Sequence, residues 1–73
     1  MTGHKKRYWL VRLRRGQRLS TTEAADRLGI DVSTYSLIEN GKRQAQLRQD
    51  TMTKISRVFG VTLDYIAEQE ERL

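Results

Sequence analysis

The fold is decided by one stretch of the chain, LSTTEAADRLGIDVSTYSLIENGKR, at residues 19–43. Gly29 lies near its middle and offers the positive φ that a tight turn requires. Asp31 follows, and its carboxylate suits the start of a new helix because it can accept a hydrogen bond from a free backbone amide. The stretch therefore predicts two short helices, at 21–28 and 32–40, joined by a tight turn.

Further features inside this stretch agree with a helix-turn-helix. Ser20 and Glu23 have the spacing of a capping box, which marks a helix start. Ala25 supplies the small residue that lets the second helix cross the first closely. The positions that must be buried to hold the crossing angle are apolar: Leu28, Ile30, Tyr35 and Ile38. Each feature is common alone, but in register they predict a helix-turn-helix over 21–40.

Similar signals outside the stretch predict three more helices, at about 5–15, 51–59 and 63–70. Thr62 suits the start of the last one, and Asp50 or Thr51 the start of the one before it. No strand pattern competes with this interpretation. The chain is therefore expected to be all-α, with five helices.

Two sets of positions follow from the five predicted helices. Glycines after the helical runs are expected to form left-handed C-terminal caps: Gly16, Gly29, Gly41 and Gly60. The apolar residues with helical spacing are expected to face the core: Trp9, Leu10, Leu13, Ala24, Ala25, Leu28, Tyr35, Ile38, Met52, Ile55, Val58, Phe59, Leu63, Tyr65 and Ile66.

The composition suits a single small domain. The 73 residues include no cysteine, which excludes a disulfide framework and a thiolate metal site. No apolar run approaches the roughly 18 residues that cross a bilayer, and no secretory leader is present. We therefore expect a soluble protein of the cytoplasm.

Charge is unevenly distributed along the chain. Fourteen Lys and Arg residues against nine Asp and Glu give a formal net charge of +5. We expect one domain over 1–73, with a basic N-terminal tail at 1–7 and an acidic C-terminal tail at 69–73. The basic tail either reaches along a polyanion such as duplex DNA or is simply a solvated terminus.

Residues 19–43 resemble the helix-turn-helix core of the Xre family, which includes lambda-type phage repressors and Cro proteins. The run ISRVFGVTLDYI at 55–66 resembles the helix, Gly-Val turn and closing helix that complete the five-helix domain of that family. The resemblance covers about residues 10–68, and its most specific piece is the run ENGKR at 39–43. It implies a lambda repressor-like DNA-binding domain of phage, plasmid or bacterial chromosomal origin.

The resemblance also explains an acid at the end of the second helix of the motif. In this family an arginine late in the first helix pairs with that glutamate, and the matching residues here are Arg14 and Glu39. Such a pair fixes the approach of two helices, and the same arginine can also face a phosphate. The alternative is an exposed Glu39 that is neutralised by Lys42.

The resemblance makes 32–40 the recognition helix and assigns base readout to its outward residues: Val32, Ser33, Ser36 and Leu37. Related repressors commonly present Gln, Arg, Lys or Asn at these positions. We therefore expect thymine methyl contacts, serine hydrogen bonds and recognition of DNA shape rather than many bidentate pairs. The alternative is that the apolar side chains contact a protein.

Phosphate contacts are expected at both ends of the motif. Thr21 and Thr22 lie at a helix N-terminus, where free amides and the helix dipole attract an anion. The other residues assigned to phosphate are Thr34, Asn40, Lys42, Arg43 and Arg14.

Enzymatic activity is poorly supported by the sequence. The only histidine, His4, lies near the N-terminus, and there is neither a cysteine nucleophile nor a metal-spaced cluster. We expect no catalysis, no cofactor and no metal site. The serious rival to DNA binding is a protein-interaction module, such as an antitoxin or accessory regulator, which Val32, Leu37 and the acidic C-terminus favour.

The sequence and the resemblance together predict a transcriptional regulator, acting as a repressor, that binds double-stranded operator DNA. A homodimer would place two recognition helices about one helical turn, roughly 34 Å, apart on a near-palindrome. The expected interface is the last helix, with Leu63, Ile66 and Leu73. When bound, the protein would be associated with the nucleoid, and the acidic C-terminus would be free for a protein partner.

Overall fold

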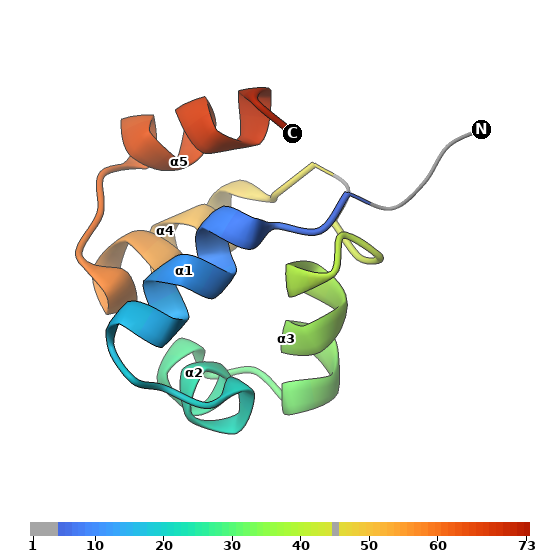
Figure 1. Cartoon of the computed structure of the whole chain (residues 1–73), viewed down its shortest axis with the longest axis vertical. Helices are drawn as coiled ribbons and strands as arrows, with labels where there is room; N and C mark the ends of the chain where they lie inside the picture. The colour runs from blue at the N-terminus through green and yellow to red at the C-terminus, as the bar shows by residue number, and fades with distance from the viewer. Residues whose placement is uncertain (1–4, 45) are drawn as a thin grey trace.

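A computed structural model describes residues 5–44 and 46–73, and over these residues the chain forms helices and no strand (Figure 1). The five helices are α1 Tyr8–Gly16, α2 Thr21–Leu28, α3 Val32–Glu39, α4 Gln49–Phe59 and α5 Leu63–Glu71. The predicted all-α, five-helix class is confirmed. None of these helices is long and apolar enough to cross a membrane.

Helix α2 and the turn that follows it form as their local signals predict. The Ser20 hydroxyl accepts a hydrogen bond from the Glu23 amide at 3.1 Å, and the Ser20 amide donates to the Glu23 carboxylate at 2.8 Å. At the other end Gly29 has a φ of 74°, which places it in the left-handed region. The Ile30 amide then bonds the Ala25 carbonyl at 3.0 Å, so the chain turns directly into α3.

The core lies where the helices meet. In it α2 packs against α3 and α4, α1 contacts α3, and α4 contacts α5. The buried apolar residues of this cluster are Trp9, Leu10, Leu19, Ala24, Ala25, Leu28, Tyr35, Ile38, Ile55, Phe59 and Ile66. Ile30 and Val61, each directly after a glycine, pack against the cluster from the turns.

One predicted core position is wrong. Leu63 remains 39% exposed, although it has helical spacing with Ile66. Leu63 is the first residue of α5, directly after the cap residue Thr62. At this end of the helix its side chain still reaches solvent, while Ile66, one turn further on, is fully buried.

Helix starts also differ from the prediction at two places. Helix α1 begins at Tyr8 rather than at residue 5, and α4 begins at Gln49 rather than after Asp50 or Thr51. The residue before α4 is Arg48, whose side chain makes no capping bond. The predicted α4 start is wrong because it relies on a polar side chain that caps the helix, and this helix begins without one.

The predicted left-handed cap at Gly16 is wrong as well. Gly16 is the last residue of α1, and the left-handed residue is Arg18, with a φ of 58°. The Arg18 amide bonds the Arg15 carbonyl at 2.9 Å, and the Leu19 amide bonds the Arg14 carbonyl at 3.1 Å. These two bonds close the helix two residues later than the glycine suggests, and they direct Leu19 into the core.

The predicted charged tails are both shorter than the sequence suggests. Arg7 is fully buried, and Glu70 lies within α5, where its carboxylate bonds Arg7 and the Trp9 indole. Residues 1–4 of the predicted basic tail, including His4, lie outside the described residues. Arg7 and Glu70 therefore belong to the folded domain.

Candidate DNA interface

Helix α3 presents one face to the core and another to solvent. Tyr35, Ile38 and Glu39 are buried, which fixes the inner face. Because successive residues of an α-helix are about 100° apart, Ser33 and Leu37 lie near the middle of the opposite face. Ser33 is exposed and Leu37 partly exposed.

Val32 and Ser36 continue this outer face toward the edge that carries Glu39. Val32 is 39% exposed and Ser36 is partly exposed. The helix therefore brings the four residues assigned to base readout onto one accessible strip: Val32, Ser33, Ser36 and Leu37. This geometry permits contact with base edges.

Thr34, which the sequence assigns to a phosphate contact, takes part in the cap of α3. Its amide and its hydroxyl both donate to the carboxylate of Asp31, at 2.9 and 2.7 Å. These bonds lower the pKa of Asp31, led by the bond from the Thr34 hydroxyl. Since the hydroxyl proton is used in this cap, the geometry favours a structural role for Thr34 over a phosphate contact.

The start of α2 offers free backbone donors. Thr21 is partly exposed and Thr22 exposed, and the first helical turn leaves amides that have no intrahelical acceptor. Glu23 lies in the same turn, and the hydrogen bond from the Ser20 amide, followed by that from its hydroxyl, lowers the pKa of this carboxyl. Glu23 is therefore negatively charged at neutral pH, and it opposes part of the attraction of this turn for a phosphate.

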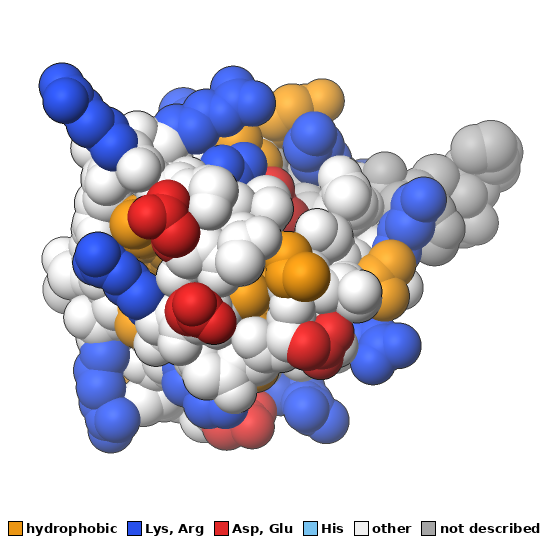
Figure 2. Space-filling model, turned by 90° about the horizontal axis from the view of Figure 1, so that it is seen from below, with side chains coloured by type: hydrophobic (Ala, Val, Ile, Leu, Met, Phe, Trp, Pro, Cys, Tyr) orange, Lys and Arg blue, Asp and Glu red, His pale blue; other side chains and the backbone are white. Residues whose placement is uncertain are grey.

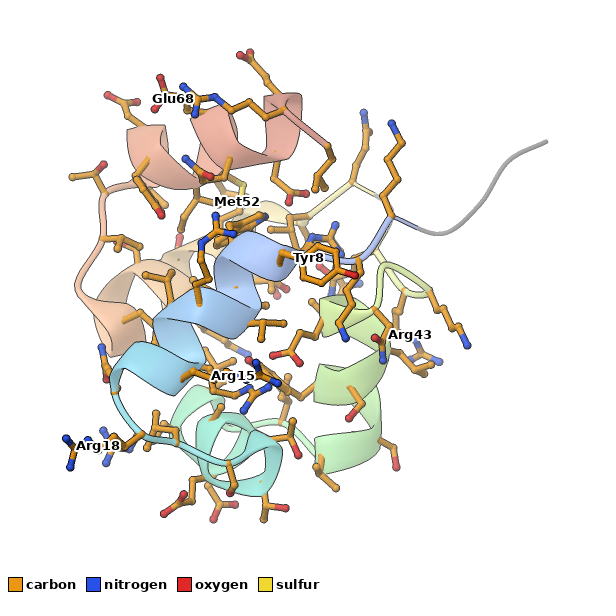
Figure 3. All side chains as sticks on the ribbon, in the orientation of Figure 1. Tyr8, Arg15, Arg18, Arg43, Met52 and Glu68 are labelled. Carbon is orange, nitrogen blue, oxygen red and sulfur yellow. The ribbon has the colours of Figure 1, made fainter. Side chains whose placement is uncertain are left out.

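Two cations follow the other end of α3. Lys42 and Arg43 are exposed, while their backbone amides bond the Leu37 carbonyl at 2.8 and 3.2 Å. The backbone of the loop is therefore tied to α3 even though the side chains are free to reach outward. Figure 3 shows Arg43 beside α3, on the side away from α1. Asn40, the cap residue of α3, is partly exposed next to them.

Arg14 and Glu39 form the ion pair that the resemblance implies. Arg14 Nε donates to Glu39 Oε2 at 2.9 Å and Nη2 donates to Oε1 at 3.2 Å. The Tyr35 hydroxyl also donates to Oε2, at 2.8 Å. The bond to Glu39 raises the pKa of Arg14, and burial raises the pKa of Tyr35. Glu39 is thus held by α1 and by its own helix rather than neutralised by Lys42.

This arrangement argues against the phosphate contact expected for Arg14. Its side chain is only 11% exposed, and Nη1 is occupied by a 3.0 Å bond to the Leu19 carbonyl. Little of the guanidinium therefore reaches the surface. Its bonds to Glu39 link α1 to the end of α3 through the Arg14 guanidinium.

Charge around the motif is not uniform. Figure 2 views the end of the molecule that carries α2, and it shows Lys and Arg side chains projecting at the rim with Asp and Glu side chains further in. The exposed acids of this region are Glu23, Asp26 and Asp31. These acids weaken the attraction of the α2 end for a polyanion, so the main cationic part of the candidate interface is at Lys42 and Arg43, beyond the end of α3.

The dimer interface expected on α5 is only partly available. Ile66 is fully buried in the core of one chain, so it cannot contact a second chain. Leu73 packs against the same core, which leaves Leu63 as the exposed apolar residue of the predicted set. The helical spacing placed Leu63 and Ile66 on one face, but only one of them reaches solvent.

One buried cluster near the interface has no signal in the sequence. Arg7 lies against the end of α3, with Glu70 of α5 as its counter-ion at 2.9 Å. The partners are 63 positions apart, and Arg7 follows two lysines in a run that suggests a solvated tail. Only the tertiary structure brings them together.

Comparison with known proteins places this geometry in a family. A family model described as helix-turn-helix matches residues 10–66, which is most of the chain. No curated protein and no solved structure matches the chain.

Proposed function

Because the chain belongs to the Xre-like helix-turn-helix family of DNA-binding regulators, we propose that it reads a specific duplex sequence with α3 and represses transcription there. The observation that carries this proposal is the accessible strip on α3, which lies between free amides at the start of α2 and the cations Lys42 and Arg43. A recognition helix needs this combination, since base contacts specify and phosphate contacts position.

Base readout in this proposal is mainly apolar. Val32 and Leu37 contact thymine methyl groups, and Ser33 and Ser36 form hydrogen bonds with base edges in the major groove. None of these residues can make a bidentate pair with a base. The specificity of each contact is therefore modest, and DNA shape contributes the rest.

Phosphate contacts in this proposal flank the strip. The amides and hydroxyls of Thr21 and Thr22 bind one strand, with the positive end of the α2 dipole behind them. Lys42, Arg43 and Asn40 bind the backbone at the far end of α3. Tethering of the loop backbone to Leu37 keeps these cations in register with the reading helix.

A homodimer completes the proposal. One module touches few bases, so two copies on a near-palindrome, with reading helices roughly 34 Å apart, provide the affinity that an operator requires. Repression follows from occupation of promoter DNA. The exposed side of α5 around Leu63 is the surface proposed for the dimer. Size-exclusion chromatography with light scattering on and off DNA tests this part, and a monomer in both states would refute it.

The experiment that tests the proposal combines selection with a salt titration. The wild-type protein is used to select duplexes from a random library, and binding to the recovered duplex is measured at several salt concentrations. If several cations contact phosphates, log K falls with log salt by roughly 0.9 per phosphate neutralised. Recovery of no preferred sequence together with a flat slope would refute DNA readout.

A protein-interaction module is the second candidate, and the exposed apolar residues favour it. Val32 and Leu63 are each 39% exposed, on helices that also carry polar or acidic faces. An antitoxin or accessory regulator can use such residues to bind a protein on the same scaffold. The salt titration separates the two candidates, because apolar contact with a protein would depend only weakly on salt.

A further inference from the structure

Arg7 is among the largest fully buried side chains of the residues that the structure describes. A buried guanidinium is costly unless its donors and its charge are matched. Contacts from the end of α3 with its loop, and from α5, provide both matches.

The first set of contacts holds the end of α3. Arg7 Nη1 donates to the Ile38 carbonyl at 2.6 Å, and the Arg7 amide donates to the Glu39 carbonyl at 2.8 Å. The last carbonyls of a helix have no intrahelical donor, and a cation is stabilising at this negative end of the dipole. Arg7 therefore acts as a C-terminal cap for the recognition helix, supplied from outside that helix.

The contacts extend into the loop that carries the proposed phosphate-binding cations. Arg7 Nη2 donates to the Gln44 carbonyl at 2.5 Å, directly beyond Lys42 and Arg43. At Gly41 the loop passes so close to the Lys5 backbone that no side chain would fit between them. Residues 5–7 therefore fix both ends of the loop at 40–44.

The second set of contacts supplies the counter-charge. Glu70 of α5 accepts from Arg7 Nε at 2.9 Å and from Nη2 at 3.0 Å. The Trp9 indole donates to the same carboxylate at 2.9 Å, which fixes its orientation. The Glu70 side chain is 17% exposed and that of Arg7 1%, so water screens this pair weakly.

We propose that Arg7 and Glu70 are positioning residues for DNA binding, through which α5 sets the end of α3 and the placement of Lys42 and Arg43. This inference rests on the proposed function. It gives the C-terminal helix a role in DNA affinity although α5 contributes no residue to the reading strip. Any change that withdraws Glu70 would loosen the loop and weaken binding.

The direction in which Glu70→Gln changes DNA affinity distinguishes positioning from simple electrostatics. Glu70→Gln removes a negative charge, and a more cationic protein should bind a polyanion more tightly. Positioning predicts the opposite, because Arg7 loses its counter-ion and holds the loop less well. Glu71→Gln makes the same charge change on the neighbouring exposed residue, so it is the matched control.

The experiment measures fluorescence anisotropy of a labelled duplex, recovered by selection with the wild-type protein, against each variant. Glu70→Gln should bind about three- to tenfold more weakly than wild type, whereas Glu71→Gln should bind equally or more tightly. Equal or tighter binding by Glu70→Gln would overturn the proposal.

A second readout needs no DNA and keeps the two proposals distinguishable. Backbone amide NMR shifts of 40–44 should move in Glu70→Gln and stay in place in Glu71→Gln. If the wild-type protein binds no duplex, the proposed function fails. If the amide shifts of 40–44 are unchanged in Glu70→Gln, the positioning role alone is overturned. If Glu70→Gln does not fold, the same measurements are made on Arg7→Lys, which keeps the positive charge. Wild-type DNA affinity together with wild-type amide shifts in Arg7→Lys would overturn the proposal.

Discussion

Arg14 of α1 and Glu39 of α3 face each other in a bidentate ion pair at the end of α3, the proposed recognition helix. Both side chains are largely removed from water, and Tyr35 shares the carboxylate. Removing both charges from water offsets much of their attraction, so the pair adds little net stability compared with apolar packing. Its geometry instead fixes the approach of α3 to α1, and the orientation of the reading strip depends on that approach.

Loss of one partner from this pair should be costly. Arg14→Met leaves Glu39 buried without its counter-ion, and the free energy of unfolding should fall by about 3 kcal/mol. Urea unfolding measures the change. Arg15→Met is the matched control, because Arg15 is exposed on the same helix, and its effect should stay within about 0.5 kcal/mol. Equal effects of the two substitutions would contradict a buried pair.

Tyr35 gives the protein a specific sensitivity to alkaline pH. Burial, reinforced by the bond to Glu39, raises the pKa of Tyr35 in the folded state. In the unfolded chain the phenol ionises near pH 10, so the unfolded state loses a proton there that the folded state keeps. Stability is therefore undiminished below about pH 10 and falls as the pH rises above it.

The matched comparison for this alkaline effect is Tyr35→Phe against Tyr8→Phe. Tyr35→Phe should cost about 1 kcal/mol at neutral pH through the lost hydrogen bond. Its thermal midpoint should then fall less steeply than that of wild type between about pH 9 and pH 11. Tyr8 is 62% exposed, so Tyr8→Phe should keep the wild-type slope. Parallel slopes for wild type and Tyr35→Phe would show that another group causes the alkaline loss.

The helix-turn-helix could be predicted from the sequence because its signals are local. Ser20 and Glu23 are three residues apart, and Gly29 is followed almost at once by Asp31. Each of these features acts through the backbone of its own turn, and each has the predicted conformation. The four residues of the outer strip follow from the resemblance to the Xre family, and the helical geometry of α3 places them on one accessible side.

The remaining features depend on contacts that spacing does not encode. Arg7 looks like part of a charged run, yet tertiary contacts with α3 and α5 bury it. Gly16 looks like a cap, but two backbone bonds beyond it move the left-handed residue to Arg18. Leu63 has the spacing of a core residue, yet at the first position of α5 it remains 39% exposed.

Gly41 should tolerate alanine less well than Gly60 does. Both glycines have a left-handed φ, 74° and 68°, so alanine is strained at each by roughly 1 kcal/mol. At Gly60 the added methyl group meets open space, whereas at Gly41 it meets the carbonyl of Lys5. Gly41→Ala should therefore lower the free energy of unfolding clearly more than Gly60→Ala in urea titrations. Equal losses in the free energy of unfolding for the two variants would mean that the Lys5 backbone moves aside at little energetic cost.

The proposed interface predicts two different kinds of DNA-binding defect. Lys42→Ala and Arg43→Ala remove phosphate contacts, which carry no sequence information, so each should weaken all duplexes about equally and reduce the salt slope by about 1. Ser33→Ala and Leu37→Ala change the reading strip, so they should alter the order of preference among duplexes that differ at single base pairs. Binding of each variant to a panel of such duplexes measures both effects.

The control for these substitutions must separate contact from net charge. Arg57→Ala removes the same charge from the exposed side of α4, which lies outside the proposed interface. Its effect should come only from the long-range field, which is largely screened beyond about 8 Å at physiological salt. If Arg57→Ala weakened binding as much as Lys42→Ala or Arg43→Ala, the affinity would reflect overall charge. If Leu37→Ala and Ser33→Ala then left the order of preference unchanged, α3 would not be the reading helix.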